Sequence, residues 1–444
     1  MTDLLITGGT LINESTRNNQ DILIRHGRIE SIGSNLQVPS SCKIIEAEGK
    51  WVLPGLIDDQ VHFREPGLTH KACIHTESQA AVAGGVTTYF EMPNVSPPTL
   101  DMERIEGKCA IAKRDSLANY AFFLGASNEN LESVKSADPV KIAGVKVFMG
   151  SSTGNMLVDE ETVLEGIFRN APTIIATHCE DTPMIMANEE QARQQYGDEV
   201  PFSEHGNIRS REACLKSSSM AVELAKRENA KLHVLHITTE EELKLFEPGH
   251  TRITAEACVH HLWFEDSSYL TLGSQIKCNP AIKKVSDRDA VRQAVVDGRI
   301  SILATDHAPH TWKEKQGSYF NAPSGLPLIQ HTLLLMLEMC EQNCFTPELI
   351  VERACHAPAR LFQVEDRGYL REGYWADLVV VDPEGKTPVK DTELFSKCGW
   401  SPFPHLTFTN AISTTIVSGK VAYDHGKLQM DCRGQRAEFA KDRR

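Results

Sequence analysis

The chain has 444 residues, of which 41% are hydrophobic and 24% charged, and its formal net charge at pH 7 is −14. This composition is typical of a globular protein with a large core, and the length suits one barrel-sized domain with an accessory module. The negative charge argues against nucleic acid or an acidic membrane surface as a partner, and no apolar run reaches the roughly 18 residues that a membrane helix needs.

The N-terminal segment MTDLLITGGT lacks a basic stretch followed by an apolar core. We therefore expect no signal peptide and a cytoplasmic location. The twelve cysteines are spread from Cys42 to Cys432 without a CxxC pair. In a chain of this length they indicate buried, reduced thiols rather than a disulfide framework.

Both ends of the chain predict small β-rich units. Residues 4–33 alternate strand-like segments with Gly and Asn turns, and so do DLVVVDP and AISTTIVSGKVAYDHG near the C-terminus. We expect residues 1–52 and 365–434 to form one small β-sandwich module. The last ten residues, 435–444, are charged and are expected to form a mobile tail.

Between these ends, residues 53–364 alternate short apolar strands with amphipathic helices. The alternation predicts an α/β fold, and eight βα units over about 250–300 residues suit a TIM-type (β/α)8 barrel better than an open sheet. The expected strands are 55–63, 86–92, 119–125, 143–149, 173–179, 231–237, 252–258 and 300–306. The clearest intervening helices are 70–84, 101–114, 159–170, 208–229 and 327–343.

Reactive side chains fall at the ends of these strands. Barrel enzymes carry their chemistry at the C-terminal ends of the strands, and the sequence places there His62, Asn94, Lys146, His178, His236 and Asp306. One histidine at a strand end is more often a hydrogen-bonded polar residue than a ligand. Lys146 alone could extend to the surface, and Asp306 alone could cap a turn. Six such residues in register predict that the side chains converge on one mouth of the barrel.

The residue types at this mouth fit a zinc site. Imidazole nitrogen and carboxylate oxygen are good zinc ligands, and a catalytic zinc keeps an open position for water, which loses its proton near neutral pH. Lys146 lies in an apolar strand, where an ammonium is costly to bury. A neutral lysine can react with carbon dioxide to form a carbamate, whose two oxygens can bridge two metals about 3.5–4 Å apart. Because His260 and His261 are adjacent, at most one faces the site, and His233 is expected to be structural.

Seven segments together resemble the cyclic amidohydrolases: GLIDDQVHFREPG (55–67), MPN (92–94), GVKVFM (144–149), THCED (177–181), HVLHIT (233–238), KCNPAIK (277–283) and ATDHAPHTWKEK (304–315). Within that group, FREPG with MPN and DHAPH most resembles the dihydroorotases. The resemblance implies reversible cyclisation of N-carbamoyl-L-aspartate to L-dihydroorotate, with loss of water, in pyrimidine biosynthesis. It also implies a small-molecule partner and a homodimer or larger homo-oligomer.

The resemblance assigns roles to residues. Lys146 would be a carboxylated lysine that bridges Zn²⁺ ions, one or two per subunit. His178 and His236 would hold one metal, and His62 and Asp306 the other. Asp306 would also be the general acid/base that moves a proton to the amide nitrogen. The substrate would be bound by Arg64, Asn94, Asn279 and His310, with Arg64 as a two-pronged donor to a carboxylate and His310 as a charge-assisted one.

The end of the first barrel strand departs from the family pattern. The family has His-x-His there, whereas this chain has Gln60-Val61-His62. Because residues i and i+2 share a strand face, Gln60 points where a ligand should be. An amide oxygen is a poorer zinc donor than imidazole. We therefore expect the metal held by His62 and Asp306 to be the weaker one, with Gln60 as a weak ligand, a water in its place, or that metal absent.

Two other functions remain open. An allantoinase or a dihydropyrimidinase would share the site, although Ser151 replaces the tyrosine expected of dihydropyrimidinases and their substrates lack the carboxylate that Arg64 would bind. The segment SGLPLIQHTL (324–333) departs from many dihydroorotases, which keeps allantoinase open. A non-catalytic relative, for example a structural partner of aspartate transcarbamoylase, would have lost metal ligands, and Gln60 is one step in that direction. Residues 310–325 are the candidate for a loop that closes over substrate.

Overall fold

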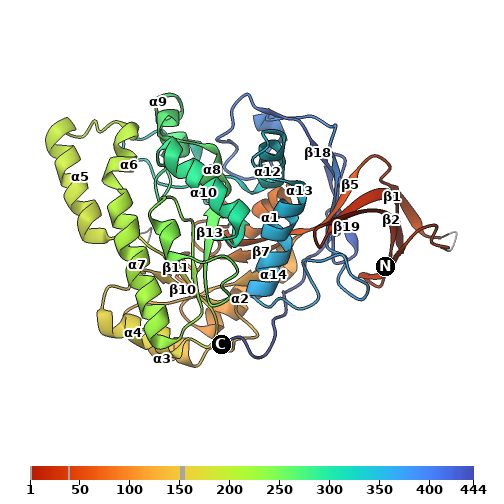
Figure 1. Ribbon diagram of the computed structural model, residues 1–444, viewed down its shortest axis with the longest axis horizontal. Coiled ribbons are helices and arrows are strands. Elements are labelled where there is room, and N and C mark those ends of the chain that lie inside the picture. The colour runs from red at the N-terminus through yellow and green to blue at the C-terminus, as the bar shows by residue number, and fades with distance from the viewer. Residues whose placement is uncertain (1–2, 39–40, 151–155) are drawn as a thin grey trace.

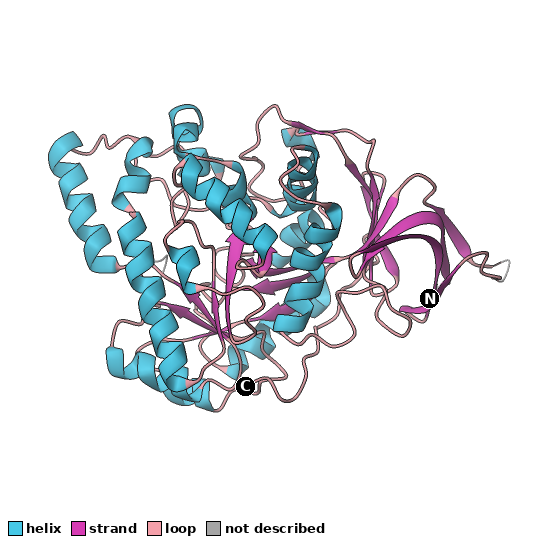
Figure 2. Cartoon of the chain, viewed as in Figure 1, coloured by secondary structure: helices cyan, strands magenta, loops and turns pink. Residues whose placement is uncertain are grey.

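The computed structural model describes residues 3–38, 41–150 and 156–444. It consists of a helix-covered barrel beside a strand-rich module that holds the N-terminus (Figures 1 and 2). The predicted combination of a TIM-type barrel and a β module built from both ends of the chain is confirmed.

The barrel strands are parallel and lie in two sheets, with orders β14-β13-β12-β11-β10-β9 and β6-β7-β8. β8 and β9 are consecutive parts of one strand, and a bridge between Val61 and His307 closes the ring. Each predicted barrel strand is present among the described residues: β6 (Leu56–Val61), β7 (Val86–Glu91), β8 (Asn119–Phe122), β9 (Leu124–Gly125), β10 (Val145–Phe148), β11 (Ile175–His178), β12 (Leu232–Val234), β13 (Ile253–Cys258) and β14 (Ile302–Ala304).

Every residue of these barrel strands is buried. Inward side chains fill the barrel and outward ones contact the helices, so both faces need apolar residues and the strands become continuous apolar runs. Polar residues within them are therefore exceptions that need a role. The fully buried ones include Asp59, Lys146, His233 and Glu256.

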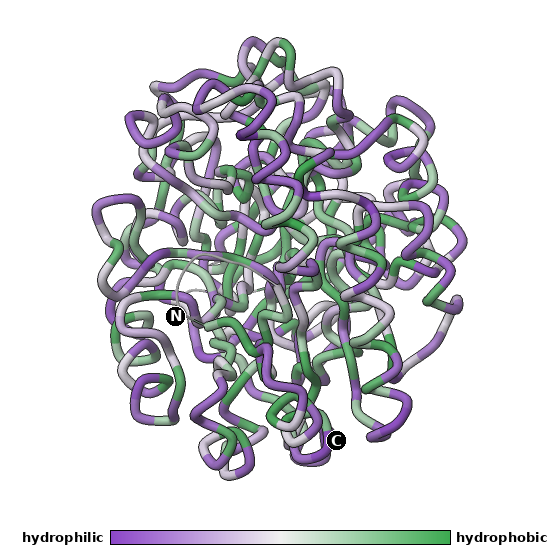
Figure 3. The backbone as a smooth tube through the Cα atoms, turned by 90° about the vertical axis from the view of Figure 1, so that its left-hand side faces the viewer, coloured by the Kyte–Doolittle hydropathy of each residue, from purple (hydrophilic) through white to green (hydrophobic). Residues whose placement is uncertain are grey.

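Helices cover the outside of the barrel (Figure 2), and hydrophilic segments predominate at the rim of the molecule (Figure 3). Side-chain caps start several of them: Asp101 accepts from the Arg104 N–H before α2, and Ser210 from the Ala213 N–H before α7. No helix in the described ranges is long and apolar enough to cross a membrane. The helices are α1 (Ile74–Ala83), α2 (Met102–Asp115), α3 (Leu131–Lys135), α4 (Glu161–Asn170), α5 (Thr182–Tyr196), α6 (His205–Ile208), α7 (Arg211–Glu228), α8 (Val259–Trp263), α9 (Tyr269–Leu272), α10 (Val285–Asp297), α11 (Trp312–Lys315), α12 (Thr332–Glu341), α13 (Pro347–Val351) and α14 (Ala357–Leu361).

The accessory module is one hydrogen-bonded sheet that interleaves strands from the two ends of the chain. Its order is β20-β19-β18-β15-β5-β1-β2-β3, with β4 paired to β1. A core of its own, including Ile6, Ile22, Val52 and Leu378, packs on this sheet. The strands are β1 (Leu4–Asn13), β2 (Thr16–Arg25), β3 (Arg28–Gly33), β4 (Lys43–Glu46), β5 (Trp51–Pro54), β15 (Leu378–Asp382), β18 (Ala411–Val417), β19 (Lys420–Asp424) and β20 (Lys427–Leu428); β16 (Thr387–Pro388) and β17 (Thr407–Phe408) form a small separate pair.

The expectation of a mobile tail over 435–444 is wrong. The Tyr120 carbonyl accepts from the Ala437 N–H at 2.8 Å, and Phe439 is only 4% exposed. The Arg443 guanidinium donates to backbone carbonyls just before β10. These contacts lie at the N-terminal ends of the barrel strands, so the tail covers the end of the barrel opposite the predicted site. The charged composition gave no sign of the two apolar side chains that become buried, Ala437 and Phe439, or of a backbone pairing that does not depend on side-chain type.

Candidate active site

A cavity lies at the C-terminal ends of the barrel strands. The structure brings nine of the ten predicted site residues to its lining: Gln60, His62, Arg64, Asn94, Lys146, His178, His236, Asn279 and Asp306. The tenth, His310, lies behind Arg64, with its Nε2 atom 3.1 Å from a guanidinium nitrogen. The other described residues of the lining, which the sequence did not single out, are Phe148, Ala308, Ser324 and Gly325.

His62 lies between Asn94 and Asp306. Its Nδ1 is 2.8 Å from Asn94 Oδ1, and its Nε2 is 3.0 Å from Asp306 Oδ1. Burial lowers the pKa of His62, although Asp306 opposes this, so the neutral ring carries a single N–H. When that N–H donates to Asn94, the Nε2 lone pair faces a carboxylate oxygen. A cation bound between these two atoms would stabilise the arrangement.

His178 and His236 form a second pair, with 2.9 Å between His178 Nδ1 and His236 Nε2. The Glu180 carboxylate lies 3.1 Å from His178 Nε2 and favours the tautomer with its proton there, which directs the Nδ1 lone pair toward His236. Burial would raise the pKa of Glu180, but the Arg209 guanidinium and His178 hold it at about 2. Burial lowers the pKa of His236 well below its ordinary value, and its Nδ1 has no hydrogen-bond partner among the described residues. Two adjacent neutral imidazoles fit a divalent metal.

Lys146 lines the same cavity from β10 and is 1% exposed. Its ammonium lies 4.6 Å from the centre of the Phe148 ring. Burial lowers the pKa of Lys146 to about 8, although the carboxylates of Asp306 and Glu256 raise it. A pKa near 8 leaves on the order of a tenth of the amine neutral at pH 7. The neutral amine is the form that can react with carbon dioxide.

Gln60 stands at the position where a histidine ligand is expected. Its amide nitrogen donates to Asp306 Oδ1 at 3.2 Å, and its amide oxygen lies 3.7 Å from Cys258 Sγ. The nitrogen has no lone pair to offer a metal. In this orientation Gln60 therefore supports the Asp306 carboxylate but adds no metal ligand beside it.

Arg64 brings a buried positive charge to the cavity. Its side chain is 3% exposed, and Nε donates to the Pro309 carbonyl at 3.1 Å. Burial lowers the pKa of Arg64 to about 10, and no carboxylate of the described residues forms an ion pair with it. Lys71 donates to His310 Nδ1 at 2.9 Å. Burial, Arg64 and Lys71 lower the pKa of His310 well below its ordinary value, so His310 is neutral here and the expected charge-assisted bond depends on Arg64 instead.

Three site residues have left-handed backbone conformations, with φ of 69° at Arg64, 42° at His236 and 50° at Asp306. For residues other than glycine this conformation costs on the order of 1–2 kcal/mol each, and it persists where surrounding contacts hold it. One such contact is the 2.7 Å hydrogen bond from the His62 N–H to the His307 carbonyl. The turns direct these side chains toward the cavity, which no local sequence pattern predicts.

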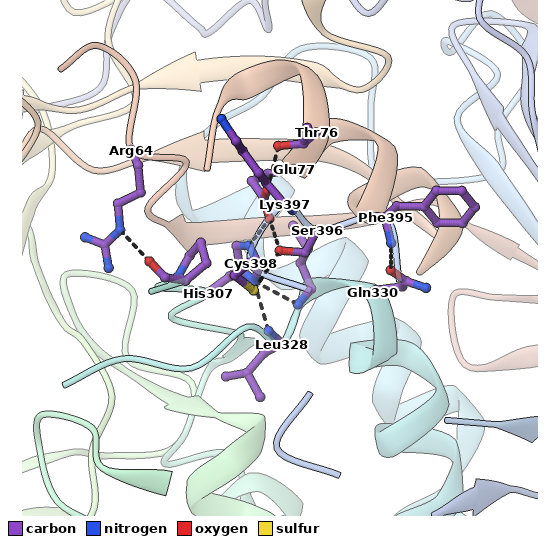
Figure 4. Close-up of polar contacts among 12 residues, drawn as sticks. Arg64, Thr76, Glu77, His307, Leu328, Gln330, Phe395, Ser396, Lys397 and Cys398 are labelled. Carbon is purple, nitrogen blue, oxygen red and sulfur yellow. Dashed lines mark hydrogen bonds and ion pairs between the residues drawn. The ribbon is translucent and has the colours of Figure 1, made fainter. Parts of the chain in front are cut away.

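A buried carboxylate, Glu77 of α1, supports the residue that follows Asp306. In Figure 4 it accepts hydrogen bonds from His307 Nε2 at 2.8 Å and from the Ser396 hydroxyl at 2.5 Å. Burial would raise the pKa of Glu77, but the bonds from His307, Ser396 and neighbouring groups hold it below its ordinary value. Sequence reasoning missed Glu77. Its only signal is an acidic residue within the predicted helix 70–84.

Three other histidines do not belong to the described cavity lining. His233 lies inside the barrel, with Nδ1 2.8 Å from the Thr254 hydroxyl and Nε2 3.4 Å from the Asp59 carboxylate. His260 and His261 are both buried on α8. The polar contacts of His233 agree with a structural role.

The predicted closing loop, 310–325, is attached to the barrel by buried lysines. Lys315 of the loop donates to the Lys277 carbonyl at 3.2 Å, and Lys277 donates to the Ala322 carbonyl of the loop at 2.7 Å. The end of this loop reaches the cavity lining.

Comparisons with known proteins bear on the family of this chain. The sequence model of the Amidohydrolase family matches residues 51–422. A dihydroorotase of Methanosarcina acetivorans is 31% identical over 417 residues, which cover 91% of this chain and 88% of that protein. An allantoinase of Bacillus velezensis is 28% identical over 433 residues, covering 96% and 94% of the two chains.

Among solved structures, L-hydantoinase (dihydropyrimidinase) from Arthrobacter aurescens has the same fold, with a TM-score of 0.93 at 24% identity over 99% of this chain and 100% of that one. Ser151, which bears on the dihydropyrimidinase alternative, lies outside the described residues. The family match spans most of the chain, and the similar proteins are named as a dihydroorotase, an allantoinase and a hydantoinase. The chain therefore belongs to the amidohydrolase family, within its cyclic amidohydrolases.

Proposed function

We propose that this enzyme is a dihydroorotase, which interconverts N-carbamoyl-L-aspartate and L-dihydroorotate in pyrimidine biosynthesis. The observation that carries this choice is Arg64, a buried guanidinium on the cavity wall without a carboxylate partner among the described residues. A buried charge without a counter-ion is costly, and a substrate carboxylate would remove that cost through a two-pronged hydrogen bond. Dihydroorotate carries a carboxylate on its ring, whereas dihydrouracil, hydantoin and allantoin do not.

The metal ligands in this proposal are His62, Lys146, His178, His236 and Asp306. In one pair a lone pair of the His62 ring faces the Asp306 carboxylate, and in the other a lone pair of the His178 ring faces the His236 ring. Each pair suits a Zn²⁺ ion, so the site would hold one or two. Lys146, as its carbamate, would bridge them. Bound zinc supplies Lewis acidity, which polarises a carbonyl and lowers the pKa of water.

The protein residues bind the substrate and move the proton. Arg64 binds the ring carboxylate and sets the orientation of the ring, and Asn94 and Asn279, which line the same cavity, bind its amide edge. Asp306 takes a proton from the attacking water and passes it to the ring nitrogen. The amide C–N bond breaks, the carbonyl carbon becomes a carboxylate and the nitrogen becomes the end of the carbamoyl group. The reverse sequence closes the ring and releases water.

Steady-state assays of the zinc-loaded protein with dihydroorotate, N-carbamoyl-L-aspartate, allantoin and dihydrouracil test the substrate. We expect turnover of the first two. Arg64→Met should lower kcat/KM for dihydroorotate on the order of 10²-fold or more, because losing one partner of a buried charge pair costs about 2–5 kcal/mol. Arg104→Met, at an exposed position of α2, is the matched control and should leave kcat/KM unchanged. Preferred turnover of allantoin would refute the proposal.

Asp306→Ala distinguishes an enzyme from a non-catalytic relative. This variant should lose turnover while it keeps the thermal unfolding transition of the wild type, because Asp306 carries the proton. Chelation of the wild type should also abolish turnover, and added Zn²⁺ should restore it. A zinc-loaded wild type that turns over none of the four compounds would instead indicate a structural role.

A further inference from the structure

A second group of potential metal-binding side chains does not belong to the described lining of the active-site cavity. His260 and His261 belong to α8, and Cys278 lies in the segment that precedes α10. One possible ligand atom from each residue lies within 4.8 Å of those from the other two. The three side chains are buried, with exposures of 1%, 5% and 1%.

The two imidazoles lack the hydrogen bonds that buried rings normally make. Three ring nitrogens lack a hydrogen-bond partner of ordinary geometry in the described part of the chain: Nδ1 and Nε2 of His260, and Nδ1 of His261. His261 Nε2 lies 3.0 Å from the Pro280 carbonyl, so a proton on Nε2 would donate there and would have to move to Nδ1 for Nε2 to bind a metal. A buried polar group without a partner costs about 1–3 kcal/mol. Three such nitrogens in adjacent rings point to a ligand that the rings bind together.

Both rings are in the protonation state that binds metals. Burial lowers the pKa of His261 to about 4, and burial with the charge of His261 lowers that of His260 well below its ordinary value, although the Thr305 backbone opposes the shift for His260. The ring centres are 3.9 Å apart, so two imidazolium charges would repel strongly. Neutral imidazole is the metal-binding form.

We propose that His260, His261 and Cys278 bind a zinc ion that is separate from the catalytic centre. Cys278 Sγ lies 3.7 Å from His261 Nε2. Tetrahedral zinc, with Zn–S and Zn–N bonds of about 2.3 and 2.0–2.1 Å, requires a sulfur–nitrogen separation of about 3.6 Å. Thiolate and imidazole favour zinc over hard cations such as magnesium. The Zn–S bond forms as the thiol proton leaves to solvent, so the site needs no oxidant or reductant.

This ion would join α8 to the segment that carries Asn279. Cys278 directly precedes Asn279, which lines the active-site cavity. The ion would therefore hold the wall of the cavity in place without taking part in the reaction. The substrate-binding role of Asn279 rests on the proposed function, whereas the metal site itself does not.

Cobalt substitution tests this site directly. Thiolate-bound Co²⁺ gives an intense charge-transfer absorption in the near ultraviolet, which imidazole and oxygen ligands of the catalytic centre do not give. Metal-free protein titrated with Co²⁺ should develop this band, and Cys278→Ser should abolish it and lower the zinc content by one ion per chain. Cys355→Ser is the matched control, because Cys355 is equally buried and its Sγ hydrogen-bonds to the Pro54 carbonyl. It should leave the band and the zinc content unchanged.

Cobalt binding without the near-ultraviolet band, or a band that persists in Cys278→Ser, would overturn the proposal. If Cys278→Ser does not fold, His260→Gln provides the second test, because it retains the thiol and should weaken Co²⁺ binding in this band at least about 10-fold. Unchanged binding in that variant would equally contradict the site. The cobalt spectrum can be recorded without turnover. It therefore tests this metal site even if the protein proves to have no dihydroorotase activity.

Discussion

At the scale of single residues, Gln60 makes the proposed metal centre differ from the family pattern, which has a histidine at this position. Its amide nitrogen donates to Asp306 Oδ1, so in this orientation it supports the carboxylate that we propose as a ligand. We expect Gln60→His to bind the weaker zinc more tightly, on the order of 10-fold or more, because imidazole is a better zinc donor than an amide. The measurement is zinc retained during dialysis against increasing chelator.

The matched control for this change is Gln194→His, at an exposed position of α5, which should retain zinc like the wild type. Two zinc ions held equally tightly by the wild type would contradict the predicted asymmetry.

Lys315 predicts a pH dependence of stability. Burial lowers its pKa from 10.5 to about 7. Between these pH values the unfolded chain binds more protons than the folded one, so the free energy of unfolding should rise with pH across this window. We expect the urea midpoint of the wild type to rise between about pH 7 and pH 9 relative to that of Lys315→Met. Lys390→Met, whose side chain is 54% exposed, should keep the wild-type slope; equal slopes for wild type and Lys315→Met would exclude this origin.

At the scale of elements, Glu77 connects three parts of the chain that are distant in sequence. It joins α1 to His307 after β14 and to Ser396 of the segment between β16 and β17 (Figure 4). Glu77→Gln removes the charge and turns an N–H toward a donor. We expect a loss of about 3 kcal/mol in the free energy of unfolding, which urea denaturation measures. Turnover should fall too, because His307 directly follows Asp306.

The control for the loss of a carboxylate is Glu132→Gln. The Glu132 side chain lies on α3 and is 85% exposed. This variant should change stability by less than about 0.5 kcal/mol. If Glu77→Gln were no less stable than this control, the carboxylate would not hold the three elements together.

The barrel strands could be predicted because both their faces are buried, which makes each one a short apolar run. The residues at which these strands end could not be predicted. The strand expected over 55–63 ends as β6 at Val61, and the one expected over 231–237 ends as β12 at Val234. Beyond β12 the backbone becomes left-handed at His236, whose N–H donates to the Glu256 carboxylate and not to a backbone carbonyl.

At the scale of the whole molecule, the C-terminal tail covers the barrel end opposite the active site. Phe439 packs edge-on against Phe90, with ring centres 5.7 Å apart, and the Arg443 guanidinium lies 4.1 Å from its ring centre. Phe439→Ala should lower the free energy of unfolding by about 3 kcal/mol because it leaves a cavity. The control is Leu270→Ala, at a side chain that is 78% exposed. Equal stability of the two variants would show that the tail adds nothing to the fold.

The sequence by itself determined the strand order and the residue types at the strand ends. It therefore also determined which side chains share the barrel mouth, because the C-terminal ends of parallel strands meet at one edge. Only the tertiary structure decided how those side chains pair: His62 with Asp306, the Gln60 amide turned toward the same carboxylate, and Arg64 buried without an ion pair to any carboxylate of the described residues. It also decided that a charged tail packs instead of moving. These features depend on desolvation and on contacts between distant segments, and neither leaves a local pattern in the chain.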